Sequence, residues 1–229
     1  MAAIARPTFN PIAEGIGIAE SLARFPLYAF DLSSLPRGNG APVMVMPGFM
    51  VGDGSTLFLR SFLTALGYRA YSWGMGINRG DVIRLMREMA PRVEDLARRT
   101  GSPVRLVGWS LGGVVAREIA RRNSGAVHSV VTMGTPVVGG PKYTAAAPIY
   151  QRMFGGDMDT IEELIAAANK RPIPVPVTAI YTRTDNVVAW EACIDPDNPH
   201  VEHIEVRTSH SGLGFNPEVF RIVAKRLAS

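Results

Sequence analysis

The stretch Val104-Arg105-Leu106-Val107-Gly108-Trp109-Ser110-Leu111-Gly112 decides the fold, because an apolar run leads into a glycine-flanked serine and a helical pattern follows at once. A strand that turns sharply into a helix strains the backbone of its central residue, and the crowded positions on either side favour glycine. The turn lifts the serine hydroxyl clear of the sheet edge and places the N–H of Leu111 at a helix N-terminus. We therefore interpret Ser110 as a candidate nucleophile.

Around this turn the sequence alternates between short apolar runs and amphipathic stretches, which is typical of parallel strands joined by crossover helices. We expect strands at residues 43–46, 69–73, 104–108, 127–133, 177–181 and 201–206. Helices are expected at residues 55–66, 81–99, 111–122, 160–169 and 217–227. The sequence thus predicts an α/β fold with a doubly wound, mostly parallel sheet of about six strands flanked by helices.

No linker-like run divides the 229 residues, so we expect a single domain over residues 1–229. Residues 1–40 are interpreted as an N-terminal helical extension with an apolar stripe that packs on the domain, or alternatively contacts a membrane surface or a partner. Residues 138–175 are too long for a simple loop and are interpreted as a small helical, lid-like insertion. The apolar stripe consists of Ile12, Ile16, Leu22, Phe25 and Leu27.

The bulk composition argues against several classes of protein. The net charge is only +4 and many arginines fall on helical patterns, so we expect a solvated basic face and no nucleic-acid partner. Cys193 is the only cysteine, which excludes an intrachain disulfide and a thiolate metal site. No signal peptide or membrane-spanning stretch is recognisable, and a cytoplasmic location is expected.

A serine hydroxyl needs a base to take its proton and a carboxylate to orient that base. Reactive groups in open α/β sheets gather at the carboxyl ends of strands. His210 follows the last expected strand in a polar loop, and Asp185 follows the strand at 177–181; we assign them as general base and orienting acid. The remaining candidates lie in turns, inside or at the start of strands, or in the insertion, and are interpreted as structural: His128, His200, His203, Asp157, Asp159, Asp195 and Asp197.

An oxyanion hole requires two N–H donors aimed at the developing negative charge. Leu111 is expected to supply one. The second is expected from the glycine-containing loop after the first strand, Met46-Pro47-Gly48-Phe49-Met50, with Phe49 as the choice and Met50 as the alternative.

Taken together, Gly108-Trp109-Ser110-Leu111-Gly112, then Asp185, then His210, with Pro47-Gly48-Phe49 upstream, resemble the α/β-hydrolase superfamily of the compact esterase or lipase type over residues 43–229. The resemblance implies a Ser-His-Asp triad, an acyl-enzyme intermediate and no metal or organic cofactor. One position departs from it: many members carry His-Gly before the oxyanion residue, and here Pro47 stands in place of that histidine.

The residues expected around Ser110 are largely apolar, which favours a small-molecule ester or lipid with an apolar acyl group. If the insertion covers the pocket, it would exclude water during attack. An acyltransferase or thioesterase could use the same triad, and a non-catalytic ligand-binding protein of this fold is a further alternative. The expected substrate-binding residues are Met50, Trp109, Met153, Phe154, Trp190 and Leu213.

Overall fold

The computed structural model describes residues 4–28, 33–198 and 200–229, with the side chains of residues 25–28 left aside. Six strands form one sheet in the order β2-β1-β3-β4-β5-β6, and every neighbouring pair is parallel. Each strand lies within one residue of its expected bounds. The strands are β1 (Pro42–Met46), β2 (Arg69–Ser72), β3 (Val104–Trp109), β4 (Val127–Met133), β5 (Val177–Tyr181) and β6 (Val201–Glu205).

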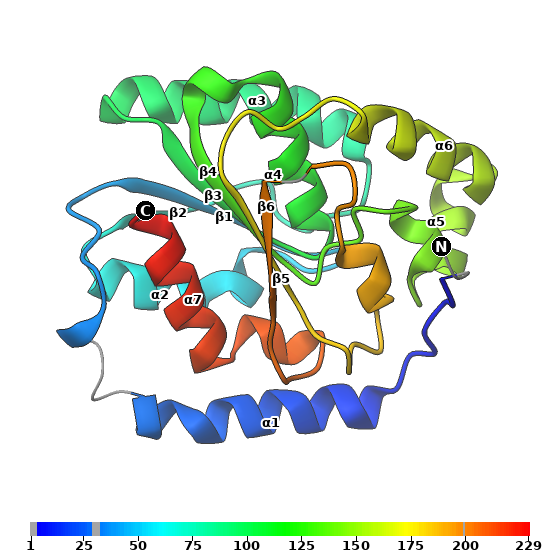
Figure 1. The fold of residues 1–229 in the computed structure, drawn as a ribbon, viewed down its shortest axis with the longest axis horizontal. Coiled ribbons are helices and arrows are strands. Elements are labelled where there is room, and N and C mark those ends of the chain that lie inside the picture. Colours follow the sequence, from blue (N-terminus) through cyan, green and yellow to red (C-terminus); the bar gives the residue numbers. More distant parts are fainter. Residues whose placement is uncertain (1–3, 29–32, 199) are drawn as a thin grey trace.

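Helices cover both faces of the sheet, as the doubly wound prediction requires (Figure 1). Helices α3 (Val82–Thr100) and α4 (Leu111–Arg122) cover one face, and α2 (Leu57–Ala65) and α7 (Pro217–Leu227) cover the other. Successive side chains of a strand point to opposite faces. Val43 and Val45 of β1 accordingly join the core with α2 and α7, whereas Met44 and Met46 join the core with α3 and α4.

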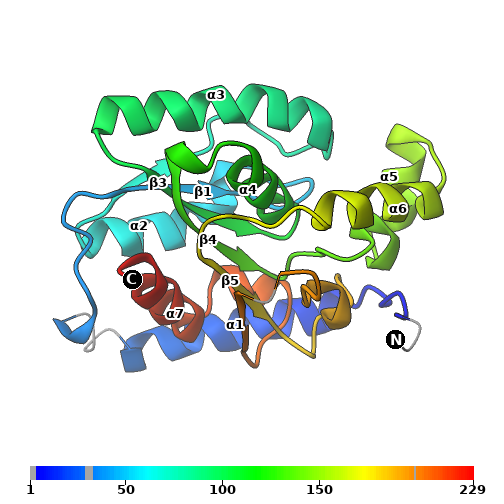
Figure 2. The same cartoon turned by 45° about the horizontal axis from the view of Figure 1, so that its top comes forward.

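The helix expected at 55–66 is shorter than predicted, because the chain first makes a 3-10 turn over Asp53–Thr56 and only then enters α2. The insertion carries α5 (Ala147–Phe154) and α6 (Met158–Asn169), which project at one end of the molecule (Figure 2). Asn169 fastens the end of α6 to the domain: its side-chain amide donates to the carbonyl of Val137 and accepts from Arg121.

The N-terminal helix α1 (Pro11–Tyr28) packs on the domain with a different face from the one that the sequence predicts. Ile12 and Ile16 are 74% and 54% exposed, and Leu22 is also exposed. The described part of the helix turns a face of small and polar residues toward the domain instead, including the buried Glu14 and Ser21. The expectation that the apolar stripe packs on the domain was therefore wrong for these three residues, while Phe25 and Leu27 lie outside the described side chains. Contact of the exposed stripe with a membrane surface stays a prediction.

Among the residues that the structure describes, no helix combines the length and the apolar character needed to cross a membrane.

Candidate active site

Ser110 lies on a sharp turn between β3 and α4 and adopts φ 54° and ψ −123°, a backbone conformation that residues other than glycine rarely adopt. Two hydrogen bonds hold it there. Its N–H donates to the carbonyl of Met133 at 2.7 Å, and the Thr135 hydroxyl donates to its carbonyl at 2.9 Å. The neighbouring end of β4 therefore braces the strained serine.

The glycines around Ser110 are required by close backbone packing. A Cβ at Gly108 would lie 2.3 Å from the Cα of Gly113, and a Cβ at Gly112 would lie 2.4 Å from the carbonyl oxygen of Met46. Real Cβ atoms do not approach backbone so closely, so α4 can pack this tightly against β1 and β3 only without side chains at these positions. The expected strand-turn-helix geometry of this stretch is present.

His210 and Asp185 form a buried pair at the same edge of the sheet. His210 Nδ1 and Asp185 Oδ2 lie 2.7 Å apart, and the other carboxylate oxygen accepts the N–H groups of Val187 and Val188 at 2.8 and 2.7 Å. Asp185 is thus held on both oxygens, and it fixes a tautomer with the proton on Nδ1, which leaves Nε2 as the acceptor.

The surroundings of His210 favour its protonated form. Burial acts to lower the pKa of His210, but the charge of Asp185, its hydrogen bond and the more distant charge of Glu14 outweigh burial and leave the pKa raised. Gly134, at φ 55°, leaves room for the imidazole, since a Cβ there would lie 2.9 Å from Nδ1. The ring of Trp109 lies beside the imidazole, with 6.1 Å between ring centroids.

Ser110 and His210 open on one cavity of about 850 Å³, within the size range of small-molecule sites. In the described part of the chain, Ser110 Oγ and His210 Nε2 are not joined by a hydrogen bond. Catalytic hydrogen bonds are commonly long or poorly aligned in structures without substrate. The arrangement therefore brings a candidate nucleophile and a candidate base to the same space, with the base already oriented by its acid.

The loop after β1 carries the expected oxyanion donor, and a fully buried asparagine holds that loop. Asn78 donates from its side chain to the carbonyl of Pro47 at 2.9 Å and accepts from the N–H of Gly80 at 3.1 Å. Its backbone carbonyl accepts the N–H of Met50 at 2.7 Å. This occupies the donor of the alternative residue, Met50.

Phe49 therefore remains the better placed of the two oxyanion candidates. In the described structure its N–H has no acceptor, and Phe49 lines the same cavity as Ser110. Leu111 occupies the first position of α4, where an N–H has no intrahelical acceptor. The positive end of the α4 dipole also lies there. Both expected donors thus border the cavity with their N–H groups unused.

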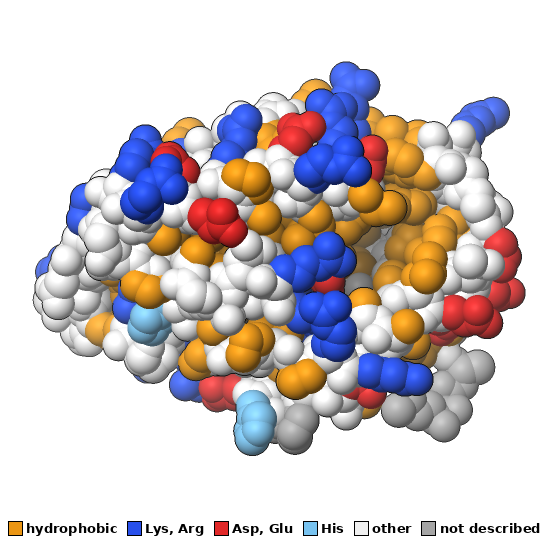
Figure 3. All heavy atoms as spheres, turned by 90° about the horizontal axis from the view of Figure 1, so that it is seen from above, with side chains coloured by type: hydrophobic (Ala, Val, Ile, Leu, Met, Phe, Trp, Pro, Cys, Tyr) orange, Lys and Arg blue, Asp and Glu red, His pale blue; other side chains and the backbone are white. Residues whose placement is uncertain are grey.

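The cavity lies between the α3 and α4 side of the domain and the insertion, where Figure 3 shows hydrophobic side chains around a hollow. The lining positions on α4 and on α6 repeat every three or four residues, so each helix turns one face to the cavity. On α4 these are Leu111, Val114, Arg117, Glu118 and Arg122, and on α6 they are Ile161, Leu164, Ile165, Ala168 and Asn169.

The structure distributes the six expected substrate-binding residues unevenly. Trp109 lines the cavity, whereas Met50, Met153 and Phe154 are exposed side chains outside its lining. Leu213 is fully buried in the core that contains α7. Trp190 stacks on Tyr181 with 5.9 Å between ring centroids. Apolar character alone does not separate a pocket wall from a core position, and this explains the difference.

Two of the rejected candidates, Asp195 and His203, have other partners. Asp195 forms a buried ion pair with Arg117, and its N–H donates to Nε2 of His203 at 2.9 Å. Within the described residues, no group of three or more histidine, cysteine, aspartate or glutamate side chains is arranged to hold a metal ion.

Sequence reasoning missed two residues that shape this site, Asn78 and Glu14. Asn78 precedes Arg79-Gly80 in a stretch that resembles an ordinary turn, and its clamp on a distant loop has no local signal. Glu14 does have one: it interrupts an apolar helix and shares a face with Gly17 and Ser21 at spacings of three and seven residues.

The sheet order, the strained serine turn after β3 and the histidine and aspartate at later strand ends define the α/β-hydrolase fold. A monoacylglycerol lipase from Paleococcus ferrophilus is similar with a TM-score of 0.62 and 16% identity, covering 85% of this chain and 96% of that one. The lipase BlEst2 of Bacillus licheniformis gives a TM-score of 0.65 and 12% identity, covering 84% and 94% of the two chains.

A thioesterase domain from the curacin biosynthetic pathway gives a TM-score of 0.57 and 12% identity, covering 85% and 93%. No family model and no curated protein sequence matches the chain. At these identities the structural likeness establishes the fold, and the chemistry has to be argued from the site itself.

Proposed function

We propose that this protein is a serine hydrolase that cleaves carboxylic esters with an apolar acyl group. The observation that carries the proposal is that His210, oriented by Asp185, lines the same cavity as the strained Ser110. A serine held in an unfavourable conformation between close-packed glycines, beside an oriented imidazole, is difficult to explain by packing alone.

In the proposed reaction, His210 Nε2 takes the proton of the Ser110 hydroxyl as Ser110 Oγ attacks the ester carbonyl. The N–H groups of Leu111 and Phe49 donate to the oxyanion of the tetrahedral intermediate. The C–O bond to the alcohol then breaks and His210 returns its proton to the departing alcohol. Water repeats the sequence on the acyl-enzyme, releasing the acid and restoring the Ser110 hydroxyl. Asp185 stays ionised and stabilises the imidazolium in both halves.

The cavity supports the choice of an apolar acyl group. Its walls on α3 and α6 are mostly apolar: α3 contributes Val82 and Met86, and α6 contributes Ile161 and Ile165. Along α4 the lining runs from Leu111 to Arg122, which at the helical rise of 1.5 Å per residue is roughly 16 Å. The α4 lining is apolar at Leu111 and Val114 and charged from Arg117 onward, so we expect the apolar chain to lie near Ser110 and against α3 and α6.

The test is hydrolysis of p-nitrophenyl esters of increasing acyl length by the purified protein. We expect activity on short to medium chains, and a loss of three orders of magnitude or more in Ser110→Ala. His210→Ala should behave similarly, while His203→Ala and His200→Ala retain activity. Unchanged turnover in Ser110→Ala, or loss in His203→Ala with His210→Ala active, would contradict the assignment.

A thioesterase is the second candidate, because the similar structures include a thioesterase domain. The triad and oxyanion donors would act identically, with a thiol in place of the alcohol as leaving group. Acyl thioesters of the same chain lengths, assayed beside the oxygen esters, distinguish the two: a higher kcat/KM for the thioester at every length would favour the thioesterase.

A further inference from the structure

Helix α1 lies directly against the loop that carries His210, and the two are joined by polar contacts. Figure 1 shows α1 running beneath the segment that leads into α7. Glu14 Oε2 accepts the N–H of Ser211, the residue after His210, at 2.6 Å. The Ser209 hydroxyl, on the other side of His210, donates to the backbone carbonyl of Glu14 at 3.3 Å. One residue of α1 thus holds both neighbours of the candidate base.

The packing around these contacts is close. A Cβ at Gly17 would lie 2.2 Å from the Ser209 hydroxyl, so glycine is needed for α1 to approach the loop. Ser21, one turn further along, shares a hydrogen bond of 3.1 Å with the Thr208 hydroxyl. The face formed by Glu14, Gly17 and Ser21 therefore matches the histidine loop, while Ile12 and Ile16 of the same helix face outward.

Burying Glu14 at this position costs free energy. The residue is only 4% exposed, and its second carboxylate oxygen is buried without a hydrogen-bond partner in the described structure. Burying a carboxylate with half of its acceptors unused is unfavourable unless a nearby cation compensates. The cation that the proposed reaction creates in the loop held by Glu14 is the protonated His210.

We propose that Glu14 is a second carboxylate of the active site, a positioning residue that holds the His210 loop in place and stabilises the imidazolium together with Asp185. The inference rests on the proposed function for its catalytic meaning. It gives α1 a part in the reaction, since removing or displacing this helix would free the loop that carries the base and take a negative charge away from its surroundings.

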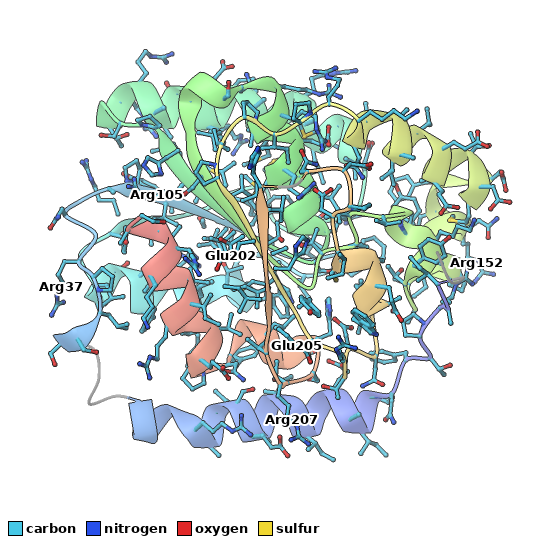
Figure 4. The ribbon with its side chains drawn as sticks, viewed as in Figure 1. Arg37, Arg105, Arg152, Glu202, Glu205 and Arg207 are labelled. Carbon is cyan, nitrogen blue, oxygen red and sulfur yellow. The ribbon has the colours of Figure 1, made fainter. Side chains whose placement is uncertain are left out.

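The electrostatics agree with this geometry. Burial acts to raise the pKa of Glu14, but the N–H and hydroxyl of Ser211, the charge of His210 and the Ser209 hydroxyl outweigh it and leave the pKa lowered, so that Glu14 is ionised at neutral pH. The charged groups that face His210 are Asp185, from the loop after β5, and Glu14, from α1. Arg207, labelled in Figure 4, precedes the loop but is an exposed side chain.

Three variants separate charge from position. Glu14→Gln keeps an acceptor for Ser211 but removes the charge, Glu14→Asp keeps the charge but shortens the reach, and Glu20→Gln removes an exposed charge of the same helix as a control. The pKa of His210 is measured directly by NMR titration of the imidazole, with the His210→Ala spectrum assigning its signal. The second readout is the pH profile of kcat/KM.

We expect Glu14→Gln to lower the pKa of His210 by roughly half a unit or more, and to move the acid limb of kcat/KM to lower pH by the same amount. Glu14→Asp should leave the pKa close to that of the parent protein but reduce kcat, and Glu20→Gln should change neither. An equal pKa of His210 in Glu14→Gln and in the parent protein would overturn the proposal.

If Glu14→Gln does not fold, Glu14→Asp still decides, because parental kcat in that variant would contradict the positioning role. The NMR titration needs no turnover, so it tests the coupling of Glu14 to His210 even if the protein hydrolyses none of the esters. If no ester is hydrolysed but Glu14→Gln still lowers the pKa of His210, the result would contradict the proposed function and leave the coupling of Glu14 to His210 intact.

Discussion

Replacing Asn78 by alanine tests whether a buried clamp sets the oxyanion loop. The substitution leaves the Pro47 carbonyl without its donor and the Gly80 N–H without its acceptor, in a place with no exposure to water. An orphaned buried polar group costs about 1–3 kcal/mol, so two of them lower the free energy of unfolding by roughly 2–6 kcal/mol. The loop that carries Phe49 would also lose its anchor.

The assay is urea unfolding followed by circular dichroism, together with kcat/KM on a p-nitrophenyl ester. Since removal of an oxyanion donor typically costs about 10²–10³ in kcat, displacement of Phe49 should reduce activity by roughly tenfold to a hundredfold. Asn186→Ala is the matched control, because its side chain makes a single bond of 3.2 Å near the surface. An unfolding midpoint and kcat/KM equal to those of the parent would refute the reasoning for Asn78.

Three further outcomes follow from the same site. Ser110→Gly should have a free energy of unfolding about 1–3 kcal/mol higher than Ser110→Ala, and so unfold at a higher urea concentration, because only glycine is unstrained at φ 54°. Equal unfolding midpoints would show that the turn is not strained. Gly112→Ala should fail to fold or have a free energy of unfolding lower by roughly 3 kcal/mol or more, since the new Cβ would lie 2.4 Å from the Met46 carbonyl oxygen. Gly125→Ala is the control, because Gly125 has open space around it and the same urea measurement should show no change. The pKa of His210 in the folded protein lies above its ordinary value of 6.5, so protonation of His210 stabilises the fold below pH 6.5 and this contribution is lost as the pH rises through the folded pKa. The difference in free energy of unfolding between the parent and His210→Ala should therefore shrink over that pH interval. A difference that grows with pH would contradict the raised pKa.

The strands and the serine turn are predictable because their signals are local. Each strand is a short apolar run, and burial on both faces of a parallel sheet requires that composition. Gly108 and Gly112 signal the turn because a Cβ at either position would collide with backbone. Asp185 and His210 follow from chain order and sheet polarity, since both come after strands whose carboxyl ends meet at one edge.

The cavity walls and α1 are less predictable, because they depend on which surfaces meet. Leu213 and Trp109 are both buried in the same core, yet only Trp109 also lines the cavity. In α1 the isoleucines suggested the buried face, but the histidine loop offers hydroxyls and an N–H, so Glu14 and Ser21 are the residues that match it. Periodicity identifies a helix face and does not say what covers it.

The central claim is that Ser110 is the nucleophile. A fluorophosphonate that reacts with activated serines, followed by peptide mass spectrometry of the labelled protein, tests it most directly. We expect one adduct, on Ser110, whose formation slows by orders of magnitude in His210→Ala and is absent in Ser110→Ala. An adduct on a different serine, or ester hydrolysis that continues after Ser110 is fully labelled, would contradict it.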